Sequence, residues 1–73
     1  MNGQEFQDAL KAMFERVAFM DDEEREEFGV PDELADVKRV RTYEEEGVLT
    51  RDAGLVVTTA DGSEFQLTVV QSR

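Results

Sequence analysis

The segment 54–70 constrains the fold of this chain more than any other part of it, because it has the pattern of a β-hairpin. Two runs rich in β-branched and aromatic residues flank the dipeptide Asp61-Gly62. An Asp-Gly pair between two such runs is the strongest short-range hairpin signal that a sequence carries. The chain is therefore expected to end in two antiparallel strands.

The register of this hairpin follows from which side chains share a face. A two-residue loop at Asp61-Gly62 pairs Phe65 with Thr58, whereas a three-residue loop at 60–62 pairs Phe65 with Val57. A slip of one residue exchanges the two faces of a strand, so the register with the cleaner apolar face is favoured. We predict the three-residue loop, which gathers five apolar residues on one face: Leu55, Val57, Phe65, Leu67 and Val69.

A helix is predicted over residues 1–20. Asn2 and Glu5 have the spacing of a capping box, in which each side chain bonds the backbone N–H of the other residue. Apolar residues then recur at intervals of three and four, which places them on one helix face. This apolar stripe contains Phe6, Leu10, Met13, Phe14, Val17 and Met20. We expect it to pack on the apolar face of the hairpin.

The segment 21–36 is predicted to hold a short acidic helix over 22–28 that ends at Gly29, followed by one further turn near Pro31. Phe28 and Val30 are the apolar residues expected to anchor it to the core. With so few apolar contacts, this segment is expected to be the most mobile part of the chain.

The segment 37–73 is predicted to form the antiparallel sheet. A strand over 37–43 has Val40 on one face and Val37 on the other, a turn follows at 44–47, and a short strand is expected at 48–50. The chain is thus expected to be a single α+β domain over residues 1–73. In this fold an N-terminal amphipathic helix and a short acidic helix pack on a three- to four-stranded antiparallel sheet ending in the C-terminal hairpin.

Charge is distributed unevenly along the chain. The formal net charge is −10, and the sixteen residues 21–36 hold nine acids and one base, a net charge of −8. Such a field repels nucleic acid and anionic membranes and attracts basic surfaces. With no signal-peptide pattern, no membrane-spanning run and no cysteine, a cytoplasmic location is expected.

The residue types for common catalytic chemistry are missing. There is no histidine and no cysteine, so the usual nucleophile and base pairs cannot form. No glycine-rich phosphate loop occurs. Glu24 and Glu27 could hold a divalent cation from one helix face, but the spacing does not match a calcium-binding loop. We therefore expect a non-enzymatic protein without a cofactor or metal.

The acidic segment is the feature that suggests a function. Its carboxylates approach the linear charge density of duplex DNA, about one charge per 1.7 Å, because a helix rises about 1.5 Å per residue. The predicted partner-binding residues are Asp21, Asp22, Glu23, Glu24, Glu26, Glu27, Asp32, Glu33 and Asp36, joined by Glu44, Glu45 and Glu46 if the fold brings them near. The hypothesis is a nucleic-acid mimic that binds the basic surface of a DNA- or RNA-binding protein. Phage anti-restriction and anti-CRISPR inhibitors share this general character, as a class analogy without a shared motif.

Three alternatives remain open at this point. The chain could be an antitoxin or immunity-type regulator that caps a basic partner, since electrostatic attraction speeds such encounters. Its acidity could instead be an adaptation to solubility or to a salt-rich cytoplasm. A homodimer formed by strand pairing near Val69 is a further hypothesis.

Overall fold

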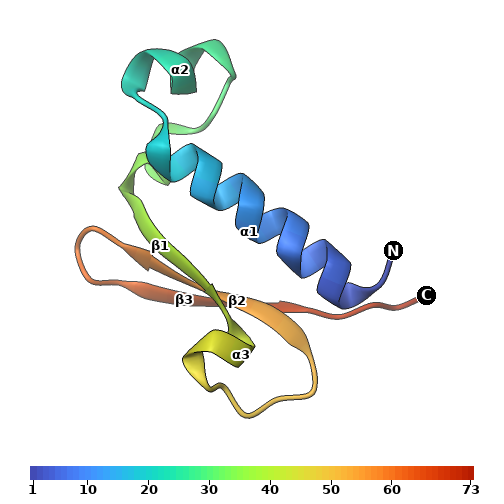
Figure 1. Ribbon diagram of the computed structural model, residues 1–73. Helices are drawn as coiled ribbons and strands as arrows, with labels where there is room; N and C mark the ends of the chain where they lie inside the picture. The colour runs from blue at the N-terminus through green and yellow to red at the C-terminus, as the bar shows by residue number, and fades with distance from the viewer.

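The computed structural model describes residues 1–73, in which one long helix lies across a three-stranded antiparallel sheet (Figure 1). The strands follow one another across the sheet in chain order: β1 (Val37–Thr42), β2 (Ala53–Thr59) and β3 (Glu64–Val69). The helical elements are α1 (Gly3–Phe19), α2 (Asp22–Glu27), the 3-10 helix η1 (Asp32–Asp36) and the single turn α3 (Tyr43–Glu46). The predicted α+β fold class is confirmed, with three strands in the sheet.

The capping box of α1 forms as predicted. Asn2 Oδ1 accepts a hydrogen bond from the backbone N–H of Glu5 at 2.8 Å, and Glu5 Oε1 accepts from the backbone N–H of Asn2 at 3.2 Å. The helix ends at Phe19, because the next residue, Met20, turns into an extended conformation. Two of the orphan donors at the helix start are thereby satisfied.

The predicted hairpin register is confirmed. Leu55 pairs with Leu67 and Val57 pairs with Phe65. The turn is closed by the backbone N–H of Thr59, which donates to the carbonyl oxygen of Ser63 at 2.9 Å. The three residues 60–62 form the loop. Its last residue, Gly62, has a φ of 87°, a conformation that residues with a side chain rarely adopt.

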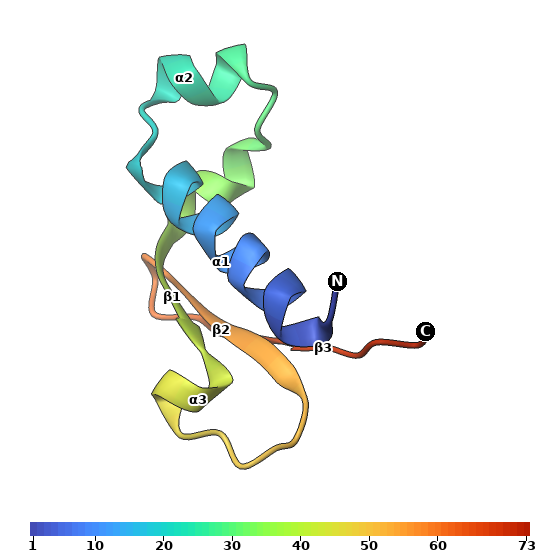
Figure 2. The ribbon, with the colours of Figure 1, turned by 45° about the vertical axis from the view of Figure 1, so that its right-hand side comes forward.

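The core lies between α1 and one face of β1 and β2. Its buried cluster is Val37, Val40, Leu55 and Val57, with Leu10, Phe14 and Leu34 packed against it. The C-terminal end of α1 lies near the start of β1, and its N-terminal end lies near the C-terminal end of β3 (Figure 2). The first half of β3 is therefore left uncovered by the helix.

The expectation that the whole apolar face of the hairpin is buried is consequently wrong at β3. Phe65 is 56% exposed and Leu67 is 39% exposed. On α1, Phe6 and Met13 are also about half-exposed, whereas Val17 is buried. The register was predicted correctly, but a single helix lying mainly over β1 and β2 cannot cover the third strand.

The predicted alternation of β1 is also wrong. Val37 and Val40 are both buried on the core side, although they are three residues apart. The register shifts between Val37 and Arg39, which are two residues apart on β1 but pair with adjacent residues of β2. A β-bulge of this kind inserts one residue and reverses the alternation, so both valines reach the core.

The segment after β1 differs from the prediction as well. In place of a turn and a fourth strand, Thr42 caps the single turn α3, and Gly47 ends it with φ of 71°. A capping box joins Thr42 to Glu45, a Thr-x-x-Glu signal that was legible in the sequence. No strand forms at 48–50, and Leu49 is fully exposed.

The segment between α1 and β1 contains the predicted short helix. Gly29 ends it with φ of 70°, as expected, and the further turn forms as η1 after Pro31. The prediction that Phe28 anchors this segment is wrong, since Phe28 is 65% exposed, whereas Val30 is partly buried. Leu34 of η1 supplies the contact with the core. No helix of the chain has both the length and the apolar character needed to cross a membrane.

Candidate functional site

Helix α2 projects away from the sheet at one end of the molecule (Figures 1 and 2). It begins at an acidic cap, since Asp21 Oδ1 accepts a hydrogen bond from the backbone N–H of Glu24 at 2.8 Å. None of its residues is buried. The carboxylates in its first turn lie at the positive end of the helix dipole, where negative charge is favourable.

We name the carboxylates of this helix and its cap the α2 acidic group: Asp21, Asp22, Glu23, Glu24, Glu26 and Glu27. All six residues are exposed. The only base among them is Arg25, whose guanidinium donates to the carbonyl oxygen of Met20 and pairs with Asp22. One positive charge against six negative charges leaves a net charge of −5 on a segment of seven residues.

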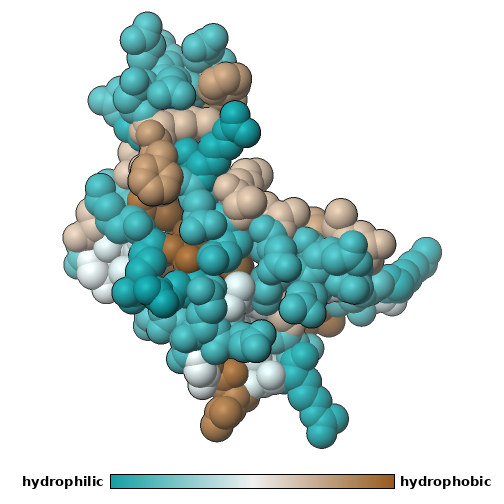
Figure 3. All heavy atoms as spheres, in the orientation of Figure 1, coloured by the Kyte–Doolittle hydropathy of each residue, from teal (hydrophilic) through white to brown (hydrophobic).

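Four members of the α2 acidic group have no partner within the chain. The side chains of Glu23, Glu24, Glu26 and Glu27 make no hydrogen bond and no ion pair, whereas Asp21 caps the helix and Asp22 binds Arg25. Figure 3 shows this projecting end as predominantly hydrophilic. The fold therefore leaves these four charges free to interact with another molecule.

The 3-10 helix η1 continues the acidic surface toward the sheet. Asp32, Glu33 and Asp36 are exposed on it, while Leu34 between them turns toward the core. The carbonyl oxygen of Asp36 accepts a backbone hydrogen bond from Ala60 at 2.8 Å, which ties the end of η1 to the hairpin loop. The nine predicted residues of segment 21–36 thus lie on α2, its cap and η1, which follow one another between α1 and β1.

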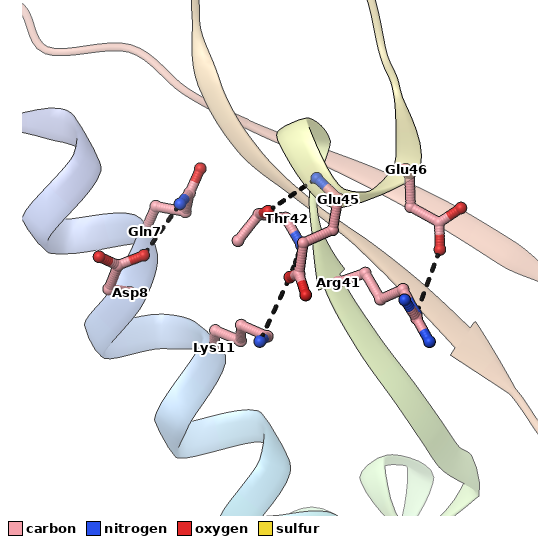
Figure 4. Close-up of polar contacts among 7 residues, drawn as sticks. All are labelled: Gln7, Asp8, Lys11, Arg41, Thr42, Glu45 and Glu46. Carbon is pink, nitrogen blue, oxygen red and sulfur yellow. Dashed lines mark hydrogen bonds and ion pairs between the residues drawn. The ribbon is translucent and has the colours of Figure 1, made fainter.

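The fold does not bring the other three predicted residues near them. Glu44, Glu45 and Glu46 belong to α3, which lies at the opposite end of β1 from α2 (Figure 1). Two of them are compensated by bases, as Figure 4 shows for Glu45 with Lys11 and for Glu46 with Arg41. The Lys11 Nζ to Glu45 Oε1 distance is 3.3 Å, and Glu46 Oε1 lies 3.6 Å from Arg41 Nε.

The side chain of Glu45 caps the start of α3. Hydrogen bonds from the backbone N–H of Thr42 and from Lys11 lower the pKa of the Glu45 carboxyl below its usual value. Arg39 also pairs with Glu46, at 3.7 Å. Arg39 and Arg41 of β1 therefore compensate Glu46 of α3, and no base of β1 pairs with a carboxylate of α2.

The carboxylates are not arranged as a metal centre. No group of three or more acidic side chains converges in a geometry that could hold a metal ion. Glu24 and Glu27, which the sequence offered as a cation pair, stand on the exposed helix without a third ligand. The chemistry available at this end of the molecule is the recognition of positive charge.

Comparisons with known proteins returned no match for this chain among family models, curated proteins or solved structures.

Proposed function

We propose that this chain is a non-enzymatic protein-interaction module that binds a basic surface through the α2 acidic group. In its most specific form it is a nucleic-acid mimic, which inhibits a DNA- or RNA-binding protein by occupying its phosphate-binding surface. The observation that carries the proposal is the set of four exposed glutamates on α2, Glu23, Glu24, Glu26 and Glu27, whose side chains have no partner within the chain.

The spacing of these charges supports mimicry. A helix rises about 1.5 Å per residue, and duplex DNA carries about one charge per 1.7 Å of its axis. Carboxylates at nearly every position of α2 give a comparable density over the length of the helix. A groove lined by Lys and Arg for phosphates would meet similar charges here, and its affinity would fall steeply with salt.

The test is a pull-down from host lysate with a matched pair of charge variants. The first variant converts the four free glutamates of α2 to glutamine. The control converts four exposed acids elsewhere that make no ion pair: Glu15, Glu44 and Glu64 to glutamine and Asp52 to asparagine. Both variants remove four negative charges, which changes the formal net charge from −10 to −6. Any difference in partner binding between the two variants therefore depends on the position of the removed charges and not on the total charge.

Mimicry predicts a partner that the wild type and the control retain at low salt and release at high salt. The α2 variant should lose that partner, and excess duplex DNA should displace it from the wild type. Retention of the partner by the α2 variant would eliminate the acidic-surface proposal. A partner that depends on α2 but resists DNA would identify the toxin-capping class, and no salt-sensitive partner would leave the acidity as an adaptation to solubility.

A further inference from the structure

The outer edge of β3 is an unpaired strand edge. β3 is the last strand of the sheet, and its neighbour β2 lies on one side only. Because Thr59 and Ser63 form a hydrogen-bonded pair, the alternation of an antiparallel ladder directs the backbone groups of Phe65 and Leu67 toward β2. The backbone groups of Glu64, Gln66, Thr68 and Val70 therefore point outward and can pair with another strand.

The two edges of the sheet are protected to different degrees. The β1 edge has the bulge between Val37 and Arg39 and the basic side chains of Lys38, Arg39 and Arg41. Bulges and charges are the devices that keep edge strands from pairing with other chains. β3 pairs with β2 without a register shift, and Glu64 is its only charged residue. Of the two edges, only that of β1 therefore has features that prevent pairing with a strand of another chain.

Exposed apolar side chains lie next to the outer edge of β3. Phe65 and Leu67 of β3 are partly exposed, and so are Phe6 and Met13 on the flank of α1. A hollow of about 560 Å³ lies between α1 and β3, and an adjoining hollow of about 430 Å³ lies between η1 and the hairpin; both have Phe14 and Leu67 in their walls. An apolar groove therefore runs beside a row of unpaired backbone groups.

We infer that a second copy of this chain occupies this edge, through antiparallel pairing of β3 with β3 about a two-fold axis at Leu67. In this register Leu67 faces Leu67 of the second copy, Phe65 faces Val69, Gln66 faces Thr68 and Glu64 faces Val70. Every outward-pointing residue from 64 to 70 then meets an outward-pointing residue, which an antiparallel ladder requires. No charged residue lies opposite another charge, so the edge is complementary to itself.

The same two-fold axis covers the apolar residues that the monomer leaves exposed. The second half of β3 lies beside the N-terminal end of α1, where Gly3 approaches Val69, whereas Phe65 in the first half remains exposed. Antiparallel pairing places the covered half of one copy next to the uncovered half of the other. Phe6 lines the hollow with Leu67 and Val69, so Phe6 of the second copy comes close to Phe65.

The size of the edge sets the expected affinity. The proposed contact is about as long as a strand of six residues, about 20 Å, and about as wide as the flank of one helix, about 10 Å. This area is smaller than the ~800 Å² per partner of a standard interface. A reversible dimer that dissociates at micromolar concentrations is therefore expected. Helix α2 lies at the opposite end of α1 from the C-terminal end of β3 (Figure 1), so the dimer does not depend on the proposed function.

Sedimentation equilibrium on the full chain from about 1 μM to about 1 mM tests the inference, with F65K and F28K as a matched pair. Both variants replace an exposed phenylalanine with lysine and change the formal net charge from −10 to −9. Burying the new lysine in the interface should weaken dimerisation by at least about 100-fold in F65K. F28K, which lies beyond α2, should dimerise like the wild type. A wild type that is monomeric at the highest concentration, or F65K dimerising as well as F28K, would overturn the inference.

Cross-linking tests the register without the lysine variants. The chain has no cysteine, so L67C introduces a single thiol at the two-fold axis. Residues facing each other there have Cα atoms about 4.5 Å apart, within the ~4.4–6.8 Å that a disulfide spans. In Q66C the two cysteines are offset by two residues along the strands, beyond about 7 Å. Mild oxidation should yield a covalent dimer of L67C and not of Q66C, and the reverse result would refute this register.

Discussion

The side chain of Tyr43 fills the space that a side chain at Gly54 would occupy. A Cβ atom on Gly54 would lie 2.2 Å from Tyr43 Cε2 and 2.6 Å from the carbonyl oxygen of Leu67. Tyr43 is buried, and its hydroxyl group forms a 2.7 Å hydrogen bond with Thr68 Oγ1 on β3. The first residue of α3 is thereby fixed against the sheet face that points away from α1.

We predict that G54A destabilises the chain by about 1–3 kcal/mol, the usual cost of overpacking a well-packed site. The added methyl group meets both an aromatic ring and a backbone oxygen, and the oxygen cannot move without disturbing β3. Urea unfolding followed by circular dichroism measures the change. G3A is the control, because a Cβ there would have only ordinary contacts of 3.9 Å with Ala53 and Val69. Equal stability of G54A and the wild type would show that Tyr43 can leave this position at little cost.

The side chain of Gln7 provides the hydrogen-bond acceptor that a neighbouring strand would provide if β1 continued. The backbone N–H of Gly54 points toward the β1 side of the sheet, but the chain has already turned into α3 there. Gln7 Oε1 accepts this hydrogen bond at 2.9 Å, and its Nε2 donates to Asp8 Oδ1 at 3.0 Å. Gln7 is the one buried polar side chain of the domain, and this bond explains its burial.

Q7M is therefore expected to cost about 1–3 kcal/mol, because it leaves a buried N–H without an acceptor. The same urea titration measures the change in the free energy of unfolding. Q4M is the matched control, since Gln4 is exposed on the same helix. If Q7M were as stable as Q4M, the Gly54 N–H would have to reach water or another acceptor.

Asp61 makes the stability of the hairpin turn dependent on pH. The hydroxyl of Thr59 and the backbone N–H of Ser63 donate to the Asp61 carboxylate and lower its pKa from 3.8 to about 2. A pKa that is lower in the folded chain means that the charged carboxylate favours folding. This contribution is fully present above about pH 4 and is lost as the pH falls through about 2.

The D61N variant isolates this contribution, because an asparagine can accept the same hydrogen bonds without titrating. We expect the stability difference between the wild type and D61N to shrink steadily between pH 4 and pH 2, as measured by urea titrations at each pH. D32N is the control for the loss of one exposed carboxylate, since the Asp32 side chain accepts no hydrogen bond. If the stability difference between the wild type and D61N stayed constant over this pH range, the folded turn would not favour the ionised carboxylate of Asp61.

The features predicted correctly from the sequence are those that depend on local chemistry. The Asn2–Glu5 capping box, the loop at 60–62 and the stop at Gly29 each involve residues only a few positions apart. The partial exposure of Phe65 could not be predicted this way, because it depends on where α1 crosses the sheet. The bulge that brings Val37 to the core was missed for a similar reason, since both valines are apolar and only tertiary packing selects the face.

The candidate site was predictable in part. The acids of 21–36 are consecutive in the sequence, so their common location follows from chain connectivity. The separation of α3 from α2 depends on the length of β1 between them, and the pairing of Glu46 with Arg39 and Arg41 depends on how α3 turns back on that strand. Charge counted along the sequence could not show which acids are compensated.

Helix α2 should open independently of the rest of the domain. It has no buried residue, and its hydrogen bonds with neighbouring segments are those of its caps, the bond from the Val30 N–H to the carbonyl oxygen of Arg25, and the bond from Arg25 to the carbonyl oxygen of Met20. Local openings of such a segment require far less free energy than global unfolding. In hydrogen exchange, the backbone amides of α2 should therefore exchange much faster than those of Leu55 and Val57 in β2.

Two variants separate the local opening from the global one. G54A should lower the protection of the β2 amides in proportion to its loss of stability and leave the α2 amides unchanged. R25A should lower the protection of the α2 amides and leave the β2 amides unchanged. It removes the hydrogen bond to Met20 and the ion pair with Asp22 but changes no contact in the core. Equal protection of α2 and β2, with equal responses to G54A, would show instead that α2 unfolds only with the whole domain. In that case the α2 acidic group would be presented to a partner as a rigid surface throughout the folded state.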